Sequence, residues 1–256
     1  MEKANRNWAE WRRFFSERRD RTFPRLEVDA NYEYLPESLA KSLAIFQFGE
    51  SGGGTVIEQA RRSSLATVDP HYGEAMQLFV AEEHRHANLL AMCVRMLKGT
   101  LIRSNWTAKL FVFARRLMGL RLKVLVLLSA EVVGICYYHL IATRLPDSKL
   151  KGLLSQIVDD ERAHLQFHCA FLRKQVTSPF RRRLFTIVWR ATMIAAAIAV
   201  LIDHRAAIRD LDIGVRSVWN RWMAYSRLAE RLVIHEKTPE AFRPGCLDRV
   251  LTVEAR

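Results

Sequence analysis

The chain has 256 residues, of which 50% are hydrophobic and 26% are charged, and its formal net charge is +13. This length and apolar content allow one sizeable core with a small appendage, and they exclude a disordered chain. The basic charge favours acidic partners such as anionic lipid. The arginines are spread over many segments without a nucleic-acid-binding motif, so we expect no nucleic-acid partner. Long apolar segments with helical periodicity dominate and predict an all-α fold.

The four cysteines, at positions 93, 136, 169 and 246, form no Cys-x-x-Cys pair. They therefore indicate neither a disulfide framework nor a zinc site. The first residues lack an uninterrupted apolar run, so we expect no secretory signal. A cytoplasmic location follows as the expectation, with peripheral contact at the inner face of the membrane as an alternative.

Residues 5–20 are expected to form a short amphipathic helix, followed by a connector to residue 36. Trp8, Trp11 and Phe15 recur at helical spacing, and arginines surround them. The preferred interpretation is a helix that docks on the protein through its aromatic side chains. The alternative is an anchor on anionic lipid, for which tryptophan and phenylalanine opposite arginine are typical.

A helix is predicted over residues 37–64, with Glu50 inside it and the sequence Ser51-Gly52-Gly53-Gly54 directly after. Three glycines each destabilise a helix by about 1 kcal/mol relative to alanine, so a bend or a break is expected there. Gly53 and Gly54 share the face of Glu50. They either leave room for dioxygen or substrate, or allow close packing of two helices.

Residues 70–98 form the next predicted helix, which contains Glu83-x-x-His86. The amphipathic segment 100–123 is long enough to cross back along the molecule. A helix over 123–145 is apolar nearly all round, which predicts burial, and Glu131 lies in its middle. A buried carboxylate there is very costly unless it is paired or bound to a metal.

Residues 148–175 are predicted to form a fourth helix, with Glu161-x-x-His164 and then His168. Two further helices are expected over 180–204 and 209–234. Residues 186–202 are apolar apart from Arg190, which is at the lower limit of length for crossing a bilayer. A buried or interfacial helix is preferred here over a transmembrane one.

The chain thus contains two copies of one pattern: a helix with a single glutamate, followed by a helix with Glu-x-x-His. Residues three apart lie one turn from each other on the same helix face, so both side chains can hold one metal ion. Docking the two helical hairpins would bring four carboxylates and two imidazoles into one core. This donor set suits a pair of iron or manganese ions. The predicted ligands are Glu50, Glu83, His86, Glu131, Glu161 and His164.

Other polar residues near these motifs have candidate roles. Glu82 and Asp160 occupy the same position relative to the two motifs, so each can accept the N–H of the histidine from the other hairpin; simple solvation is the alternative. Arg85 could connect that network. Tyr138 shares a face with Glu131 and is a candidate hydrogen-bond or redox partner, or a packing residue. His168 is a third imidazole ligand, a proton relay or a core histidine.

The residues from 37 to about 175 resemble the ferritin-like superfamily of di-iron carboxylate proteins, through Glu50, Glu83-x-x-His86, Glu131 and Glu161-x-x-His164. The hairpin spacings are similar to those of aldehyde-deformylating oxygenases and demethoxyubiquinone hydroxylases. The resemblance implies a four-helix bundle with a central crossover, two iron ions (or manganese, alone or with iron) and dioxygen activation. We therefore expect an N-terminal segment over 1–36, a di-iron bundle over 37–177 and a helical extension over 178–256 that packs on the bundle.

The expected function is that of a di-iron oxidase or oxygenase. Its partners would be O2, an apolar or lipid-like substrate and, for an oxygenase, an electron donor. One alternative is a ferroxidase or a peroxide-scavenging relative of ferritin and rubrerythrin, although a rubredoxin-like Cys-x-x-Cys is missing. Another is a membrane-associated bundle without enzymatic activity. A homodimer is compatible with the sequence.

Overall fold

The computed structural model describes residues 6–19, 21, 32, 34–52, 54–107, 109, 118–146 and 148–235. Over these residues the chain is helical and contains no strand, which confirms the all-α prediction. The helices are α1 (Trp8–Arg18), α2 (Glu37–Glu50), α3 (Gly54–Arg61), α4 (Pro70–Met96), α6 (Leu120–Arg144), α7 (Lys149–Arg173), α8 (Pro179–Asp210) and α9 (Val215–Ile234).

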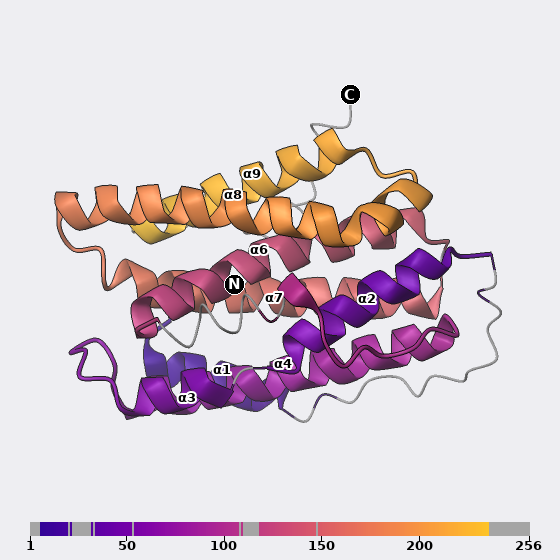
Figure 1. The fold of residues 1–256 in the computed structure, drawn as a ribbon. Coiled ribbons are helices and arrows are strands. Elements are labelled where there is room, and N and C mark those ends of the chain that lie inside the picture. The colour runs from indigo at the N-terminus through magenta and orange to yellow at the C-terminus, as the bar shows by residue number, and fades with distance from the viewer. Residues whose placement is uncertain are drawn as a thin grey trace.

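Two helix pairs form the centre of the molecule. Helix α2 packs along α4, and α6 packs along α7; α4 also contacts α7, so the two pairs meet. Helix α1 lies on α4, and α3 lies against α4 and α6. Helices α8 and α9 run along one side of the molecule, while α1, α3 and α4 lie on the opposite side (Figure 1). Through this arrangement α8 covers α2 and α6, and α9 covers α6 and α7.

Side-chain caps fix the residues at which several helices begin. Asp69 accepts a hydrogen bond from the Tyr72 N–H at 2.9 Å, and Pro70 occupies the first turn of α4. Ser148 caps α7 in the same way by accepting from the Lys151 N–H at 3.3 Å. Because each cap sets the start of its helix, it also sets which residues face the centre of the molecule.

Helix α6 is a core helix, as its composition predicts. Nearly every residue from 123 to 138 is buried, Ser129 and Glu131 included. The Ser129 hydroxyl donates to the carbonyl of Val126 at 2.7 Å, which satisfies it within the helix. By length and composition α6 and α8 could each cross a membrane, but the apolar stretch of α6 is 89% buried in the protein, whereas that of α8 is 22% buried.

The predicted helix over residues 37–64 is divided in two. Helix α2 ends at Glu50, and α3 begins at Gly54, so the glycine-rich sequence produces the break that its low helix propensity favours. The Ser51 hydroxyl closes the end of α2 by donating to the carbonyl of Phe48 at 2.7 Å. Gly53 lies outside the described residues.

Helix α1 docks on the protein through its aromatic side chains. Trp8, Trp11 and Phe15 are each at most 3% exposed, and their rings meet that of Phe167 on α7. The indole N–H of Trp8 donates to the carbonyl of Thr67 at 2.7 Å. These three aromatic side chains therefore contact protein, and the lipid-anchor interpretation of this helix is wrong.

Two predicted segments fall partly outside the described residues. In the predicted crossover segment 100–123, residues 108 and 110–117 lie outside the described residues. In the tail, residues 236–256 do. The helix predicted over 180–204 continues to Asp210, and the next one begins at Val215.

Candidate metal centre

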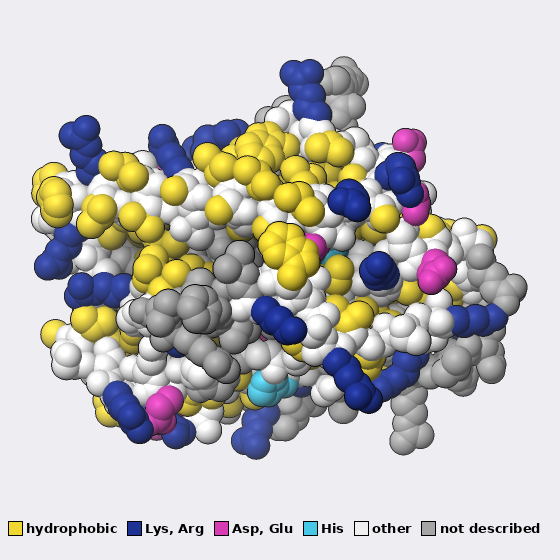
Figure 2. All heavy atoms as spheres, in the orientation of Figure 1, with side chains coloured by type: hydrophobic (Ala, Val, Ile, Leu, Met, Phe, Trp, Pro, Cys, Tyr) yellow, Lys and Arg dark blue, Asp and Glu magenta, His cyan; other side chains and the backbone are white. Residues whose placement is uncertain are grey.

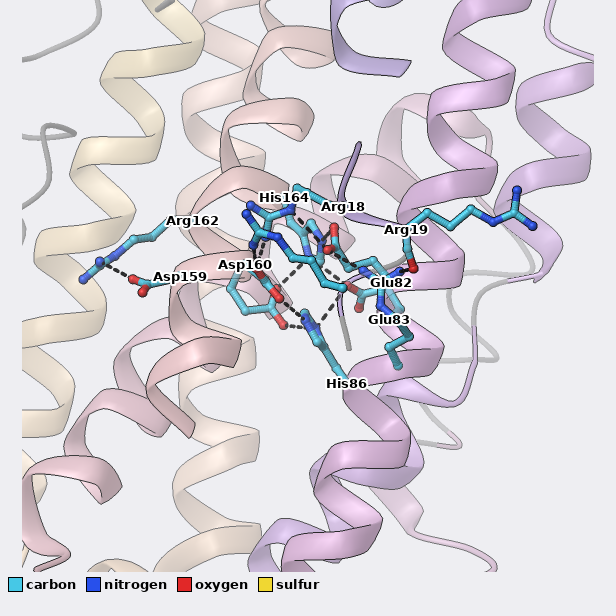
Figure 3. Close-up of polar contacts among 12 residues, drawn as sticks. Arg18, Arg19, Glu82, Glu83, His86, Asp159, Asp160, Arg162 and His164 are labelled. Atoms are coloured by element: carbon cyan, nitrogen blue, oxygen red, sulfur yellow. Dashed lines mark hydrogen bonds and ion pairs between the residues drawn. The ribbon is translucent and has the colours of Figure 1, made fainter. Parts of the chain in front are cut away.

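The two Glu-x-x-His motifs meet in the interior, one from α4 and one from α7 (Figure 3). The four side chains Glu83, His86, Glu161 and His164 are buried, and one ligand atom from each lies within 4.8 Å of the others. Buried carboxylate oxygens and imidazole nitrogens at this separation could hold a metal ion.

Both imidazoles turn Nδ1 toward the motif carboxylates. His164 Nδ1 lies 2.8 Å from Glu83 Oε1 and 3.0 Å from Glu161 Oε2. His86 Nδ1 lies 3.1 Å from Glu161 Oε1 and 3.8 Å from Glu83 Oε1. Each of the two glutamates therefore lies between both imidazoles.

The far nitrogen of each imidazole meets a carboxylate on the other motif helix. His86 Nε2 lies 3.3 Å from Asp160 Oδ2, and His164 Nε2 lies 3.1 Å from Glu82 Oε2. With a metal ion bound, hydrogen bonds of this kind would hold the proton on Nε2 and leave the Nδ1 lone pair free for the metal. We call Glu82 and Asp160 the outer carboxylates.

Arginines neutralise the outer carboxylates. Arg18 of α1 bridges them: its Nε lies 3.2 Å from Glu82 Oε1, and its Nη2 is in close contact with Asp160. Arg85 adds a second ion pair to Glu82 at 2.7 Å, and it also donates to the backbone carbonyl of Arg19 at 3.1 Å. Burial alone would raise the pKa of Glu82, but His164 and the two arginines lower it to about 2. Glu82 is therefore ionised at neutral pH.

The single glutamates of α2 and α6 adjoin this group: Glu50 lies beside Glu83, and Glu131 lies beside Glu161. Glu50 Oε1 accepts a hydrogen bond from the Tyr138 hydroxyl at 3.2 Å. Glu131 Oε1 lies 3.2 Å from His168 Nε2, and its other oxygen lies 3.9 Å from His164 Nδ1. We call Glu50, Glu83, Glu131 and Glu161 the inner carboxylates. All six ligands predicted from the sequence thus lie in one place.

Crowding and burial disturb the titration of the inner carboxylates. The pKa values of Glu50 and Glu131 are raised well above their usual range, by burial first and then by the charges of Glu83 and Glu161. The pKa of Glu161 is lowered despite its burial, because Glu131 and His164 stabilise its ionised form. Burial would lower the pKa of His164, but the charges of Glu83 and Glu161 raise it.

The donor set fits a metal cation better than it fits the protein alone. Glu83 Oε1 and both ring nitrogens of His168 are buried. Although Glu83 Oε1 lies near His164 and His168 Nε2 lies near Glu131, none of these atoms makes a hydrogen bond of good geometry within the described structure. The arginines of this region contact the outer carboxylates, while the nitrogens beside the inner ones belong to histidines. A bound cation would neutralise the inner carboxylates and remove their mutual repulsion.

A cavity of about 290 Å³ adjoins this cluster. Glu50, Glu83 and Glu131 lie on its wall, and α8 contributes apolar residues such as Ala196 and Val200. Its remaining lining is largely apolar, with polar groups at Thr107, Asp203 and His204. Of the residues around the helix break, Gly49, Ser51 and Gly52 line the cavity. Gly53 lies outside the described residues, and Gly54 is the first residue of α3. The role in substrate or dioxygen access that the sequence predicts for these two glycines therefore stays a prediction.

Sequence reasoning did not single out Arg18 as part of this site. The spacing of Trp8, Trp11, Phe15 and Arg18 contains the signal, because steps of three, four and three residues place all four on one helix face. His204 was also missed. Its Nδ1 lies 2.8 Å from the Ser42 hydroxyl, which is 2.6 Å from the Tyr137 hydroxyl, so this buried trio joins α2, α6 and α8.

Comparisons of the chain with protein-family models, with curated proteins and with solved structures found no match.

Proposed function

We propose that α2, α4, α6 and α7 form a ferritin-like bundle whose centre binds two iron or manganese ions and uses O2 to oxidise an apolar substrate. The observation that carries this proposal is the meeting of two buried Glu-x-x-His motifs, each accompanied by one glutamate from a neighbouring helix. Ferritin-like di-iron and di-manganese proteins use this set of ligands.

The positions of the side chains support a division of roles. His86 and His164 would each bind one metal ion through Nδ1. Glu83 and Glu161 each lie near both imidazoles, so either carboxylate would be able to bind a metal ion held by either histidine. Glu50 and Glu131 would each complete the coordination of one ion.

A bound redox-active metal pair supplies the electrons that reduce dioxygen. The residues of the chain control the surroundings of that reaction. Glu82 and Asp160 would accept the Nε2 protons of the two imidazoles, and Arg18 contacts both outer carboxylates. The Tyr138 hydroxyl orients Glu50. Burial and the neighbouring His164 lower the pKa of His168 to about 3, which keeps its imidazole neutral beside Glu131 at pH 7.

The cavity supports oxidation of an organic substrate over simple iron storage. Phe46, Phe79 and Val133 line it beside the inner carboxylates. Such a wall excludes water and offers a small apolar molecule a place next to the metal ligands. Turnover as an oxygenase would also require an external electron donor.

Oxygen consumption by the reduced iron form tests this proposal. The metal-free protein would be loaded anaerobically with Fe(II) and mixed with O2, with and without fatty aldehydes or quinols. We expect oxygen uptake by the wild type and by Glu58→Gln, an exposed control on α3. Glu161→Gln should abolish it, because one carboxylate that would hold the metal is lost. Iron loading without any reaction with O2 would rule the proposal out.

A further inference from the structure

Helix α8 has two apolar faces, and the protein covers one of them. Phe185, Trp189, Met193 and Ala197 recur every four residues and are buried against the rest of the molecule. The indole N–H of Trp189 donates to the carbonyl of Ser226 on α9 at 3.1 Å. This face holds α8 on the protein.

The other apolar face is exposed along the length of the helix (Figure 2). Its six large side chains are 44% to 75% exposed and follow one another at helical spacing: Phe180, Leu184, Ile187, Ile194, Ile198 and Ile202. Single exposed apolar residues are ordinary in soluble proteins, but a continuous row of them marks an interaction surface. We call this row the α8 stripe.

Arginines stand at both ends of the α8 stripe. Arg181, Arg182 and Arg183 are exposed at the beginning of the helix, and Arg205 and Arg209 are exposed at its end. The acidic groups near the second end are Asp203, Asp210 and Asp212. Asp203 is half-buried and accepts from the Thr107 hydroxyl, and Asp210 pairs with Arg209 at 2.9 Å and accepts from Ser38 at 2.7 Å. The charge around the stripe is therefore basic.

An open hollow of about 590 Å³ lies at the second end, between α8 and the start of α9. Ile198, Ile202 and Val215 give it an apolar floor, and Arg205 and Arg209 stand on its wall. Two guanidinium groups beside an apolar floor match the chemistry of an anionic phospholipid, whose phosphate and acyl chain are joined in the same way.

We propose that the α8 stripe docks the protein on an anionic membrane surface, with Arg205 and Arg209 on lipid phosphates. The helix lies in the plane of the interface, because its other face is already packed on the bundle. If α8 crossed the bilayer instead, the charged groups attached to it would enter the hydrocarbon region. These include the ion pair between Arg190 of α8 and Glu230 of α9, at 3.0 Å.

The charges argue against a second copy of the chain as the partner of this face. If two copies paired through their stripes in antiparallel fashion, Arg181–Arg183 of one copy would face Arg205 and Arg209 of the other. Parallel pairing would set each cluster against itself. Both arrangements bring like charges together, whereas an anionic lipid surface attracts both clusters.

Flotation with lipid vesicles tests the proposal with the full-length chain. We expect the wild type to float with phosphatidylcholine vesicles that contain phosphatidylglycerol, and not with phosphatidylcholine alone. The double variant Arg205→Gln/Arg209→Gln should bind about 25-fold more weakly, since each arginine near an anionic surface contributes about a fivefold factor. Ile194→Ser/Ile198→Ser should weaken binding by roughly tenfold or more.

The matched control is Arg62→Gln/Arg95→Gln, which removes the same charge from exposed positions directly after α3 and on α4. These two helices lie on the side of the molecule opposite α8 (Figure 1). The control variant should bind like the wild type, and circular dichroism should show the same helix content in all variants. Failure of the wild type to bind phosphatidylglycerol vesicles would overturn the proposal. So would an equal loss in the control, or a dimer that Ile194→Ser/Ile198→Ser separates.

Discussion

At the scale of single residues, Glu131 is the clearest case of a side chain whose burial is unfavourable for folding. It lies in the middle of an almost wholly apolar buried helix, and burial and the neighbouring Glu161 and Glu83 raise its pKa. The nitrogens within 4 Å of it belong to His164 and His168. A buried carboxyl group of this kind destabilises the metal-free protein, and such groups are typical of functional sites, including those that bind a metal.

The substitution Glu131→Leu should therefore separate stability from metal binding. It removes a buried carboxyl group from a crowded cluster, so we expect the metal-free protein to gain about 1–3 kcal/mol in its free energy of unfolding. Iron binding should be greatly weakened. Urea unfolding and metal analysis measure the two effects. Glu58→Leu, at an exposed position, should change neither, and a less stable Glu131→Leu protein would contradict our account of the site.

Arg18 is the second residue on which the site depends. Its replacement in Arg18→Met leaves the outer carboxylates buried with less compensation, because of the arginine contacts only those of Arg85 and Arg21 remain. We expect the free energy of unfolding to fall by about 2–4 kcal/mol. The affinity for the metal should fall by roughly 10- to 100-fold. Arg12→Met is the control from the same helix. Its exposed pair with Glu74 should be worth about 1 kcal/mol or less. Equal losses in both variants would show that Arg18 has no special role.

At the scale of elements, the contact of α8 with α2 and α6 includes a buried histidine. His204 meets the Ser42 hydroxyl, which meets that of Tyr137, and Asp203 is the neighbouring charged group on α8. Burial is the main cause that lowers the pKa of His204 to about 4, from an ordinary value of 6.5. Its imidazole is therefore neutral in the folded protein and takes up a proton on unfolding in weak acid.

This shift predicts a pH dependence of stability. The contribution of His204 is fully present above pH 6.5, and it is lost as the pH falls from 6.5 toward 4, because the unfolded chain binds a proton that the folded one does not. The slope should approach about 1.4 kcal/mol per pH unit. The free energy of unfolding of the chelator-treated protein would be measured by urea unfolding at several pH values, for the wild type and for His204→Asn. The difference between the two proteins isolates the contribution of His204. A difference that stays constant from pH 7 to about pH 4 would refute the assignment.

The sequence allowed some elements to be predicted and left others open. The helix break after Glu50 follows from three consecutive glycines, and the burial of α6 follows from an apolar surface on all sides. For α8 the same composition was ambiguous. Trp189 and Met193 on one face and Ile194 and Ile198 on the other are all apolar, so periodicity could not say which face the protein covers. Only the packing of α2, α6 and α9 decides that.

At the scale of the whole molecule, the site joins residues that are far apart in the sequence. Spacing within a helix predicted that Glu83 and His86, and Glu161 and His164, share a face. The repeat of the pattern predicted that the two pairs meet. The bridge from Arg18 to Glu82 and Asp160 depends on the angle at which α1 docks, and that angle is set by tertiary packing that local sequence does not encode.

Metal binding should stabilise the folded molecule as a whole. An ion that binds only the folded state at about 100 times its dissociation constant adds about 2.7 kcal/mol, which corresponds to a rise in melting temperature of roughly 5–10 °C for a chain of this size. Anaerobic Fe(II) or Mn(II) should produce this rise in the wild type, and a chelator should reverse it. Glu83→Ala/Glu161→Ala should show no rise; a rise of the same size in that variant would place the ion elsewhere.

The most direct test of the metal centre is iron analysis combined with Mössbauer spectroscopy of the Fe(II)-loaded protein before and after exposure to O2. Our account predicts about two iron ions per chain, which O2 converts to a magnetically coupled Fe(III) pair. A protein that retains no iron, or that shows only isolated single iron ions after oxidation, would contradict it.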